Sequence, residues 1–266
     1  NHILMKKFLI TLLMSLILVS SVSAGTDGEN SISKKNKPVK DCFEGLNRTT
    51  FSMNQGLDKA IFKPIAKTYR TLPSEIRVGA NNVLENLSSL VTIPNNILQG
   101  EFKTAGVNTG RFIINTTAGI LGIINVAEKI GFSEYRKEDY GQTLGVWGVG
   151  AGCYLVLPIL GPSTVRDTTG SFVNVLGGDP YYNASVSGNN NYLKNSDYLI
   201  TKFLTGVDFR AKNLETLDNL ETNSIDFYAS VRSLYLQDRK QKIKNSNSNK
   251  ALEIIYDADW EEIETQ

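Results

Sequence analysis

The chain has 266 residues, of which 41% are hydrophobic and 21% are charged, as in ordinary globular proteins. Its formal net charge of +1 leaves no basic excess, so we expect no nucleic acid among its partners. The only histidine, His2, precedes the expected start at Met5, which excludes histidine-dependent nucleophilic catalysis and most zinc sites. We therefore expect that the protein is not an enzyme and uses no cofactor.

The first 24 residues are typical of a signal peptide. Lys6 and Lys7 form a positive start, residues 8–19 (FLITLLMSLILV) form a short apolar segment, and small residues lead to Ala24. Twelve apolar residues are too few to span a bilayer, so we expect cleavage near Ala24 and export. Because no cysteine directly follows that site, we expect a protein that is not lipidated. The polar residues 25–40 predict a flexible linker.

Hydrophobic periodicity predicts amphipathic helices from Asp41 onward. A second helix follows residue 73, and Pro94 is expected to open a separate short helix that Gly100 ends in the C′ position. The first helix has an apolar face at multiples of three and four, which Pro64 interrupts by a kink or a restart; this face contains Leu46, Met53, Leu57, Ile61, Ile65 and Tyr69.

Two long uncharged stretches follow, and neither is built as a clean membrane-spanning helix. A helix from Phe102 runs into the first, residues 112–127, and the second, residues 141–163, contains six glycines and two prolines. Glycine and proline break a spanning helix, so we expect short apolar strands or turns there, a β-hairpin near 144–160 that bends at 150–152. The simpler interpretation is a packed hairpin in the protein core.

The C-terminal third is predicted to contain two more helices. Residues 177–198 are rich in loop-forming residues, and helices are expected at about 207–222 and 225–243. Residues 244–266 lack a pattern and become acidic, which predicts a mobile tail. The chain is thus predicted to be mainly α-helical, with one domain at 41–243.

Two cysteines, Cys42 and Cys153, remain in the exported chain. An oxidising compartment permits a disulfide, yet their distance in the sequence gives no geometric support for one. We expect two separate thiols that behave as small hydrophobic groups.

Several motifs together resemble the MlaA/VacJ family of outer-membrane proteins. DCFEGLNRTTFSMNQGLDKAIFKPIAKTYR (41–70) is similar to the family's opening D-P-F-E-G-x-N-R-x-x-F-x-x-N-x-x-L-D. The resemblance is strongest in EDYGQTLGVWGVGAGCYLVLPILGPSTVRD (138–167) and continues in DFYASVRSLYLQDR (226–239). It departs from the family at Cys42, where proline is usual, and at the missing N-terminal cysteine.

The resemblance implies a ring of amphipathic helices in the outer membrane, largely in its periplasmic leaflet, with a central amphipathic channel. It implies retrograde transport: mislocalised phospholipids leave the outer leaflet through the channel and pass to a periplasmic lipid-binding carrier, which maintains lipid asymmetry. A trimeric porin is the second implied partner. The alternatives are a soluble periplasmic lipid-binding carrier and a structural protein that braces a porin.

Candidate residues for the lipid path come from the two uncharged stretches. Arg111 and Arg166 flank these stretches and are candidates for contact with the headgroup, although an ion pair would explain each equally well. Small, neutral polar and aromatic residues are the candidates for the path itself: Asn115, Thr116, Gly119, Gly122, Gly145, Trp147, Gly148, Gly150, Tyr154, Leu157 and Pro158.

Overall fold

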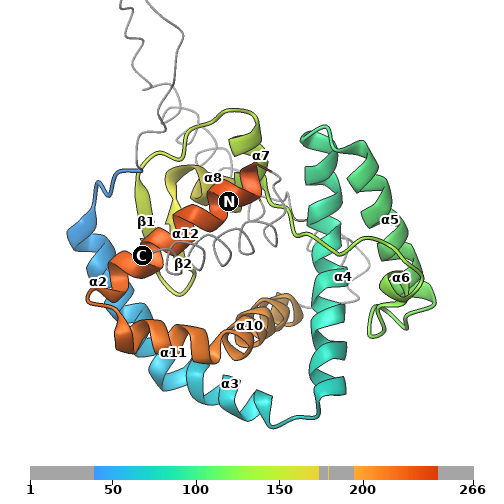
Figure 1. Cartoon of the computed structure of the whole chain (residues 1–266), viewed down its shortest axis with the longest axis horizontal. Coiled ribbons are helices and arrows are strands. Elements are labelled where there is room, and N and C mark those ends of the chain that lie inside the picture. Colours follow the sequence, from blue (N-terminus) through green and yellow to red (C-terminus); the bar gives the residue numbers. More distant parts are fainter. Residues whose placement is uncertain (1–38, 174–178, 180–194, 245–266) are drawn as a thin grey trace, which may run out of the picture. The chain divides into compact units, whose positions relative to one another are not determined.

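The computed structural model describes residues 39–173, 179 and 195–244, which all belong to one compact unit, Val39–Gln266. The predictions for the signal peptide, for all but the last two residues of the linker 25–40 and for all but the first residue of the acidic tail 244–266 lie outside these residues. Within the described part the protein is mainly helical, with a single two-stranded sheet, as predicted (Figure 1).

The first helix is interrupted just before Pro64, as its sequence predicts. Helix α2 (Glu44–Leu57) passes into a π-helical turn, η1 (Asp58–Phe62), and α3 (Lys63–Arg70) begins with the proline in its first turn. Proline has no amide hydrogen, and the first turn of a helix needs none there. The widened turn η1 itself was not predicted.

Helix α4 corrects one expectation, because Pro94 does not open a new helix. A single helix of 25 residues, Ser74–Leu98, contains Pro94 in its interior. Buried polar side chains around the proline hold this turn in place: Thr143 donates to Asn95 Oδ1 at 2.6 Å, and Asn108 donates to Asn96 Oδ1 at 2.8 Å. Gly100 follows the helix with φ of 79° in the C′ position, as predicted.

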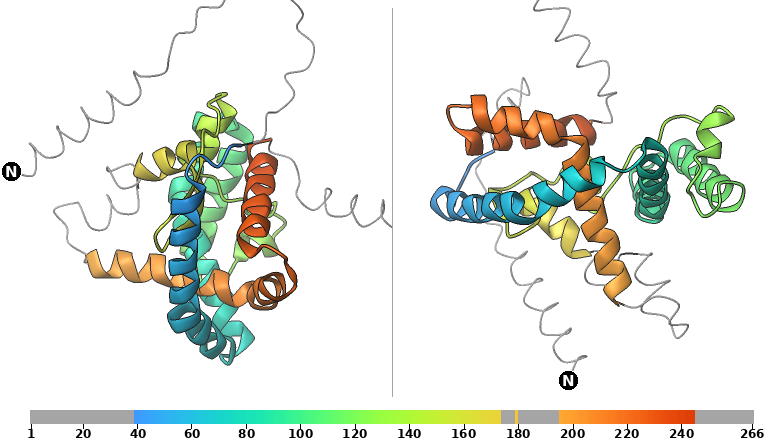
Figure 2. Two further views of the ribbon diagram at one scale, coloured as in Figure 1. Left: turned by 90° about the vertical axis from the view of Figure 1, so that its left-hand side faces the viewer. Right: turned by 90° about the horizontal axis from the view of Figure 1, so that it is seen from below.

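Helix α5 (Phe102–Thr117) matches its prediction and packs beside α4 (Figures 1 and 2). Asn86 of α4 donates to Thr116 of α5 at 2.9 Å. The turn after α5 approaches α4 closely at Gly122, where φ is 96° and an added Cβ would lie 2.7 Å from Asn86 Cβ. The short helix α6 (Val126–Lys129) completes this side of the unit.

The predicted hairpin exists, but its position differs from the expectation. Residues 144–146 lie in helix α7 (Tyr140–Val146), which Asp139 caps by accepting from Gln142 N at 2.9 Å. The strands β1 (Tyr154–Leu157) and β2 (Gly161–Thr164) pair antiparallel, so the chain reverses at 158–160 and not at 150–152. Helix α8 (Val165–Val173) follows directly.

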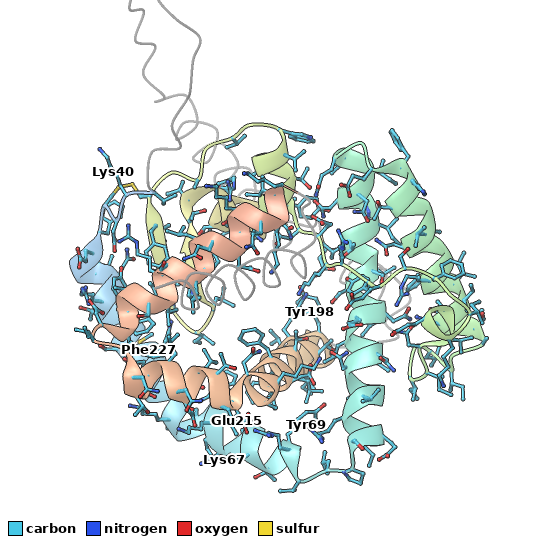
Figure 3. The ribbon with its side chains drawn as sticks, viewed as in Figure 1. Lys40, Lys67, Tyr69, Tyr198, Glu215 and Phe227 are labelled. Atoms are coloured by element: carbon cyan, nitrogen blue, oxygen red, sulfur yellow. A yellow bond between two sulfur atoms is a disulfide. The ribbon has the colours of Figure 1, made fainter. Side chains whose placement is uncertain are left out.

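Residues 195–244 form three helices, where two were expected. The first expected helix is divided at Asn213 into α10 (Asn195–Lys212) and α11 (Leu214–Asn223), and its start lies earlier than predicted. Residues 195–198, expected in a loop, belong to α10. Helix α12 (Phe227–Ile243) agrees with its prediction. Helix α10 packs on α3 and α4, and Tyr69 of α3 donates to Asp208 of α10 at 3.2 Å (Figure 3).

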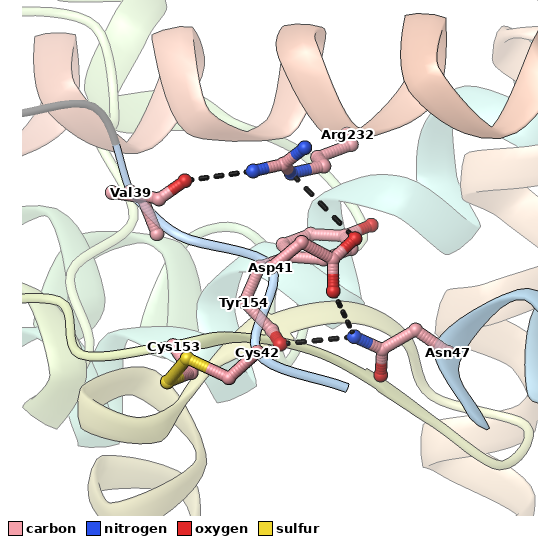
Figure 4. Close-up of a disulfide and its surroundings, with 7 residues drawn as sticks. All are labelled: Val39, Asp41, Cys42, Asn47, Cys153, Tyr154 and Arg232. Atoms are coloured by element: carbon pink, nitrogen blue, oxygen red, sulfur yellow. Dashed lines mark hydrogen bonds and ion pairs between the residues drawn. A yellow bond between two sulfur atoms is a disulfide. The ribbon is translucent and has the colours of Figure 1, made fainter. Parts of the chain in front are cut away.

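The expectation of two separate thiols is wrong, because Cys42 and Cys153 form a disulfide (Figure 4). Their Cα atoms lie 5.6 Å apart across a sequence separation of 111 residues. Tertiary structure creates this proximity: Tyr154 N donates to Lys40 O at 2.8 Å, so the start of β1 lies alongside the segment before α2. The sequence contains no local signal for such a pairing.

Helix α2 holds β1 through two asparagines. Asn47 donates to Tyr154 O at 3.0 Å and accepts from Val156 N at 2.9 Å. Asn54 donates to Leu157 O at 2.9 Å and accepts from Ile159 N at 2.7 Å. These side chains satisfy backbone groups of β1 and of the turn that follows it.

Candidate functional site

A cavity of about 340 Å³ lies between α4, residues 137–139, the β-hairpin, α8, α10 and α12. Part of its wall is apolar: Leu84, Leu87 and Val91 share one face of α4, and the hairpin contributes residues from both strands and from its turn. The apolar lining consists of Leu84, Leu87, Val91, Leu157, Leu160 and Pro162.

The rest of the cavity wall carries an unusual number of charges for a protein interior. Hydroxyl groups of serine, threonine and tyrosine complete it. The charged lining residues are Lys137, Glu138, Asp139, Asp167, Asp179, Lys202 and Arg239. A cavity lined by both apolar and charged side chains is suited to an amphipathic ligand.

Arg239 of α12 joins two aspartates beside the cavity. Its guanidinium donates to Asp139 at 2.7 and 2.9 Å and to Asp167 at 2.8 Å. Burial alone would raise the pKa of Asp139, but the hydrogen bonds and charge of Arg239 outweigh it and lower this pKa to about 2. The pKa of Asp167 is also lowered, because the hydrogen bonds and charge of Arg239 again outweigh the effect of burial. Both carboxylates are therefore ionised at neutral pH.

The helices that carry these aspartates cross at two glycines. Gly170 of α8 lies so close to Gly141 of α7 that an added Cβ would be 2.3 Å from Gly141 N. A side chain at either position would force the helices apart. The close crossing brings Asp139, which caps α7, and Asp167 of α8 within reach of the same arginine.

A second ion pair is contributed by α10. Lys202 Nζ lies 3.3 Å from Asp179 Oδ2, and Tyr198 donates to the same carboxylate oxygen at 2.7 Å (Figure 3 labels Tyr198). Asp179 is fully buried, whereas about half of the Lys202 side chain is exposed.

Glu138 is the carboxylate of the cavity that is poised to titrate near neutral pH. Its side chain accepts a hydrogen bond from Gln99 Nε2 at 3.0 Å, and its amide donates to Thr92 Oγ1 at 3.2 Å. Burial raises the pKa of Glu138 to about 7, because the ionised form loses its hydration there.

Most residues predicted for the lipid path do not line this cavity; Leu157 does. Arg111 and Asn115 line a much smaller pocket of about 10 Å³ between α4, α5 and α6. Arg111 is buried and donates to Ser133 O at 2.6 Å and to Asn125 Oδ1 at 3.2 Å, so neutral acceptors surround it. Arg166 is also buried and pairs with Asp167 at 2.9 Å.

The remaining candidates are spread over several local environments. Tyr154 is fully buried near Tyr228 and Tyr235, and Trp147 is exposed and donates to Leu98 O at 2.9 Å. Thr116, Gly119 and Gly122 lie where α5 and its following turn meet α4 or their own backbone. Gly145 contacts Ile243, Gly148 and Gly150 have open space, and Pro158 is exposed at the hairpin turn.

Sequence reasoning missed the charged wall of the cavity. Glu138 and Asp139 directly precede the uncharged stretch 141–163, and Lys202 follows the loop-rich residues 177–198, but neither position by itself indicates a site. Proximity of residues from α4, α10 and α12 has no signature in one sequence. The apolar spacing of Leu84, Leu87 and Val91, by three and four, was the one available signal.

The exterior of the unit exposes many large apolar side chains along α4, α5 and the turn after α5. The described helices include none that is both long and apolar enough to cross a bilayer. Exposed apolar patches of this kind mark sites of contact with a membrane or another protein. They include Ile76, Val78, Ile97, Leu98, Phe102, Ile113, Ile120, Leu121, Ile123 and Ile124.

Comparison with known proteins gives a consistent result. The family model described as "MlaA lipoprotein" matches residues 39–242. A Haemophilus influenzae protein named "Intermembrane phospholipid transport system lipoprotein MlaA" is 30% identical over 97% of this chain and 99% of its own length. The Escherichia coli protein of the same name is 33% identical over 83% of this chain and 82% of its own.

A solved structure described as "Structural basis for maintenance of bacterial outer membrane lipid asymmetry" has the same fold. It matches with a TM-score of 0.66 and 31% identity, covering 77% of this chain and 99% of its own. The relatives are named lipoproteins, which conflicts with our expectation that this chain is not lipidated.

Proposed function

Because the chain belongs to the MlaA lipoprotein family, we propose that it acts in phospholipid transport between the membranes of a bacterial envelope. In this proposal it sits at the outer membrane and removes phospholipids that are mislocalised in the outer leaflet. It passes them to a periplasmic lipid-binding carrier and so maintains lipid asymmetry. A trimeric porin is proposed as its partner in the membrane.

The observation that supports this function best is the cavity with its mixed lining of charged and apolar side chains. A phospholipid combines a charged headgroup with apolar acyl chains, and the cavity lining contains both charged side chains and apolar side chains of α4 and the hairpin. At about 340 Å³ it is near the lower end of ligand cavities, which run from about 300 to 1,000 Å³. It would therefore hold a headgroup and the start of the chains, and the path would continue along the apolar wall.

The exposed apolar side chains support a membrane location over that of a soluble carrier. Phe102 is 70% exposed and Leu121 is 71% exposed, and each would cost free energy in water that burial in lipid recovers. A soluble carrier would have its large apolar surface inside the cavity. The chain instead presents much of it outside, on α4, α5 and the following turn.

Transport is tested in cells whose own MlaA homologue has been deleted. A membrane-impermeant amine reagent labels phosphatidylethanolamine in the outer leaflet, and mass spectrometry measures the labelled fraction. Expression of this chain should return the labelled fraction toward that of the parent strain, with an empty vector as control. An unchanged labelled fraction, with the protein present in the outer-membrane fraction, would overturn the proposal.

Membrane location is tested separately by an alkaline carbonate wash of the isolated outer membrane. Mature protein that stays with the washed membrane supports an embedded protein. Release into the soluble fraction would favour the periplasmic carrier.

A further inference from the structure

We propose that Lys137 binds the phosphodiester of the transported lipid in the cavity. The inference rests on the proposed function and goes beyond it by naming the residue and the chemical group that it recognises. Nothing in the sequence motifs singles out Lys137; its position in the cavity wall does.

Lys137 differs from the other cations of the cavity in its partners. Arg239 is held by two aspartates at 2.7 and 2.8 Å, and Lys202 lies 3.3 Å from Asp179. The ammonium group of Lys137 makes no hydrogen bond or ion pair with any residue in the described ranges 39–173, 179 and 195–244. Its positive charge is thus available to a ligand.

The electrostatic surroundings of Lys137 favour an anion as that ligand. Neighbouring residues of the cavity wall remove part of the hydration of the Lys137 ammonium group, although the residue as a whole is exposed, and this lowers its pKa. The positive charge of Lys202 lowers the pKa further, against the opposing effect of Asp139. Two lysines thus face a common space. An anion placed between them would relieve their repulsion, and a phosphodiester carries one negative charge.

The backbone at Lys137 is held in place before any ligand arrives. Gln142 Nε2 donates to Lys137 O at 3.3 Å, and the next amide, that of Glu138, donates to Thr92 of α4. Tyr135 hydrogen-bonds to the same threonine at 2.8 Å. A fixed backbone leaves only the lysine side chain to be ordered on binding, which lowers the entropic cost.

The exposure of the Lys137 side chain fits a site that must also release its ligand. The side chain is exposed although it lines the cavity. Water that reaches the ammonium group weakens its attraction for phosphate, since charges interact less in a high dielectric. A buried cation such as Arg166 would hold the phosphate more tightly and would need a carboxylate partner, as Arg166 does with Asp167.

The test measures binding of a short-chain phosphatidylglycerol to the purified full chain in a neutral detergent, by calorimetric titration. Lys137→Gln should weaken binding about tenfold or more, the loss expected for a hydrogen bond to a charged group. Lys137→Arg should retain most of the affinity. Lys103→Gln on α5, an exposed lysine outside the cavity lining, is the matched control and should bind like the original chain.

Two further ligands identify the group that is recognised. A short-chain diacylglycerol, which lacks the phosphate, should bind equally to the original chain and to Lys137→Gln. Inorganic phosphate should compete only at concentrations far above those of the lipid. Competition at equal concentrations would mean a free-anion site and would overturn the inference.

The failures of the two proposals are distinguishable. If the original chain binds no phospholipid, the proposed function fails. If it binds phosphatidylglycerol and Lys137→Gln binds it equally well, only the role of Lys137 fails. If Lys137→Gln weakens the binding of diacylglycerol as much as that of phosphatidylglycerol, the effect is purely structural and the inference is overturned. Circular dichroism melting of each variant checks that it folds.

Discussion

Asn47 and Asn54 lie seven residues apart on α2, and each hydrogen-bonds to the backbone of the hairpin with both ends of its amide: Asn47 within β1, and Asn54 at the end of β1 and in the following turn. Two helical turns span about 11 Å, close to the distance that three residues cover in a strand. The helix can therefore pair with the strand edge at two points, and the hairpin that lines the cavity is positioned by α2.

Asn47→Ala should destabilise the protein more than Asn54→Ala. Asn47 is 2% exposed, so its loss leaves the Val156 amide and the Tyr154 carbonyl buried without these partners, at a cost of about 2–3 kcal/mol. Around Asn54, water can replace the hydrogen bond lost at the exposed Ile159. We therefore expect Asn54→Ala to lower the free energy of unfolding by about 1 kcal/mol. Denaturant unfolding of both variants in one neutral detergent gives the two values. Equal losses of unfolding free energy would contradict this difference between the two asparagines.

Arg239→Met should cost about 3 kcal/mol of unfolding free energy. The substitution removes one of the two cations beside Asp167, whose side chain is 7% exposed, and leaves only Arg166 at 2.9 Å. Removing one partner from a buried ion pair is strongly destabilising. Asp139 is 35% exposed, so water recovers part of its loss. Lys242→Met removes a pair on the same helix in which both side chains are about half exposed, and this control should cost less than about 1 kcal/mol.

Glu138→Gln should stabilise the protein at pH 8 and have little effect at pH 4.5. The pKa of Glu138 is about 7 in the folded protein, whereas a glutamate in the unfolded chain has a pKa of 4.5. The folded state therefore holds the proton more firmly. Its stability contribution is therefore complete below about pH 4.5 and is lost as the pH rises through 7. The variant should gain about 2–3 kcal/mol relative to the original chain across this range. A difference that does not change with pH would show that Glu138 titrates normally.

Reduction of the disulfide should lower the free energy of unfolding by about 3–5 kcal/mol, because the bond closes a long loop. Cys42→Ser together with Cys153→Ser should reproduce the loss. Maleimide labelling of the denatured protein tests the bond directly: neither cysteine should react until a reductant is added.

Leu87→Glu should impair transport without removing the protein from the membrane. The change places a carboxylate on the apolar wall of the cavity, next to the expected course of the acyl chains. Surface labelling of phosphatidylethanolamine should rise toward that of the deletion strain. Ile225→Glu introduces the same charge at a fully exposed position and serves as the control; equal behaviour of the two variants would remove the α4 wall from the lipid path.

The sequence predicted those features that depend on neighbouring residues. Pro64 at a helix start, Gly100 after a helix end and the extent of α12 all follow from local backbone chemistry. Pro94 misled the prediction, because buried contacts of Asn95 and Asn96 keep α4 continuous through it. The hairpin was placed too early, because the cap at Asp139 that starts a helix was not recognised.

The sequence motif predicted that the chain belongs to the family, but it did not predict which contacts the motif residues make. Its two asparagines correspond to Asn47 and Asn54, and its final aspartate to Asp58, which pairs with Arg210 of α10 at 2.8 Å. In each case the partner is more than 100 residues away in the sequence. The cavity has the same origin, since helices distant along the chain supply its charges, and a single sequence holds no record of which of them meet.

The disulfide between Cys42 and Cys153 also makes the stability of the fold depend on the redox state of the compartment. Thiols remain reduced in the cytosol, so this bond cannot persist in a chain still waiting on that side of the membrane. The start of β1 then lacks its covalent link to the segment before α2, and the chain remains easier to unfold for passage through a secretion channel. On the proposed route to the outer membrane, oxidation after passage would add the covalent link between the start of β1 and the segment before α2.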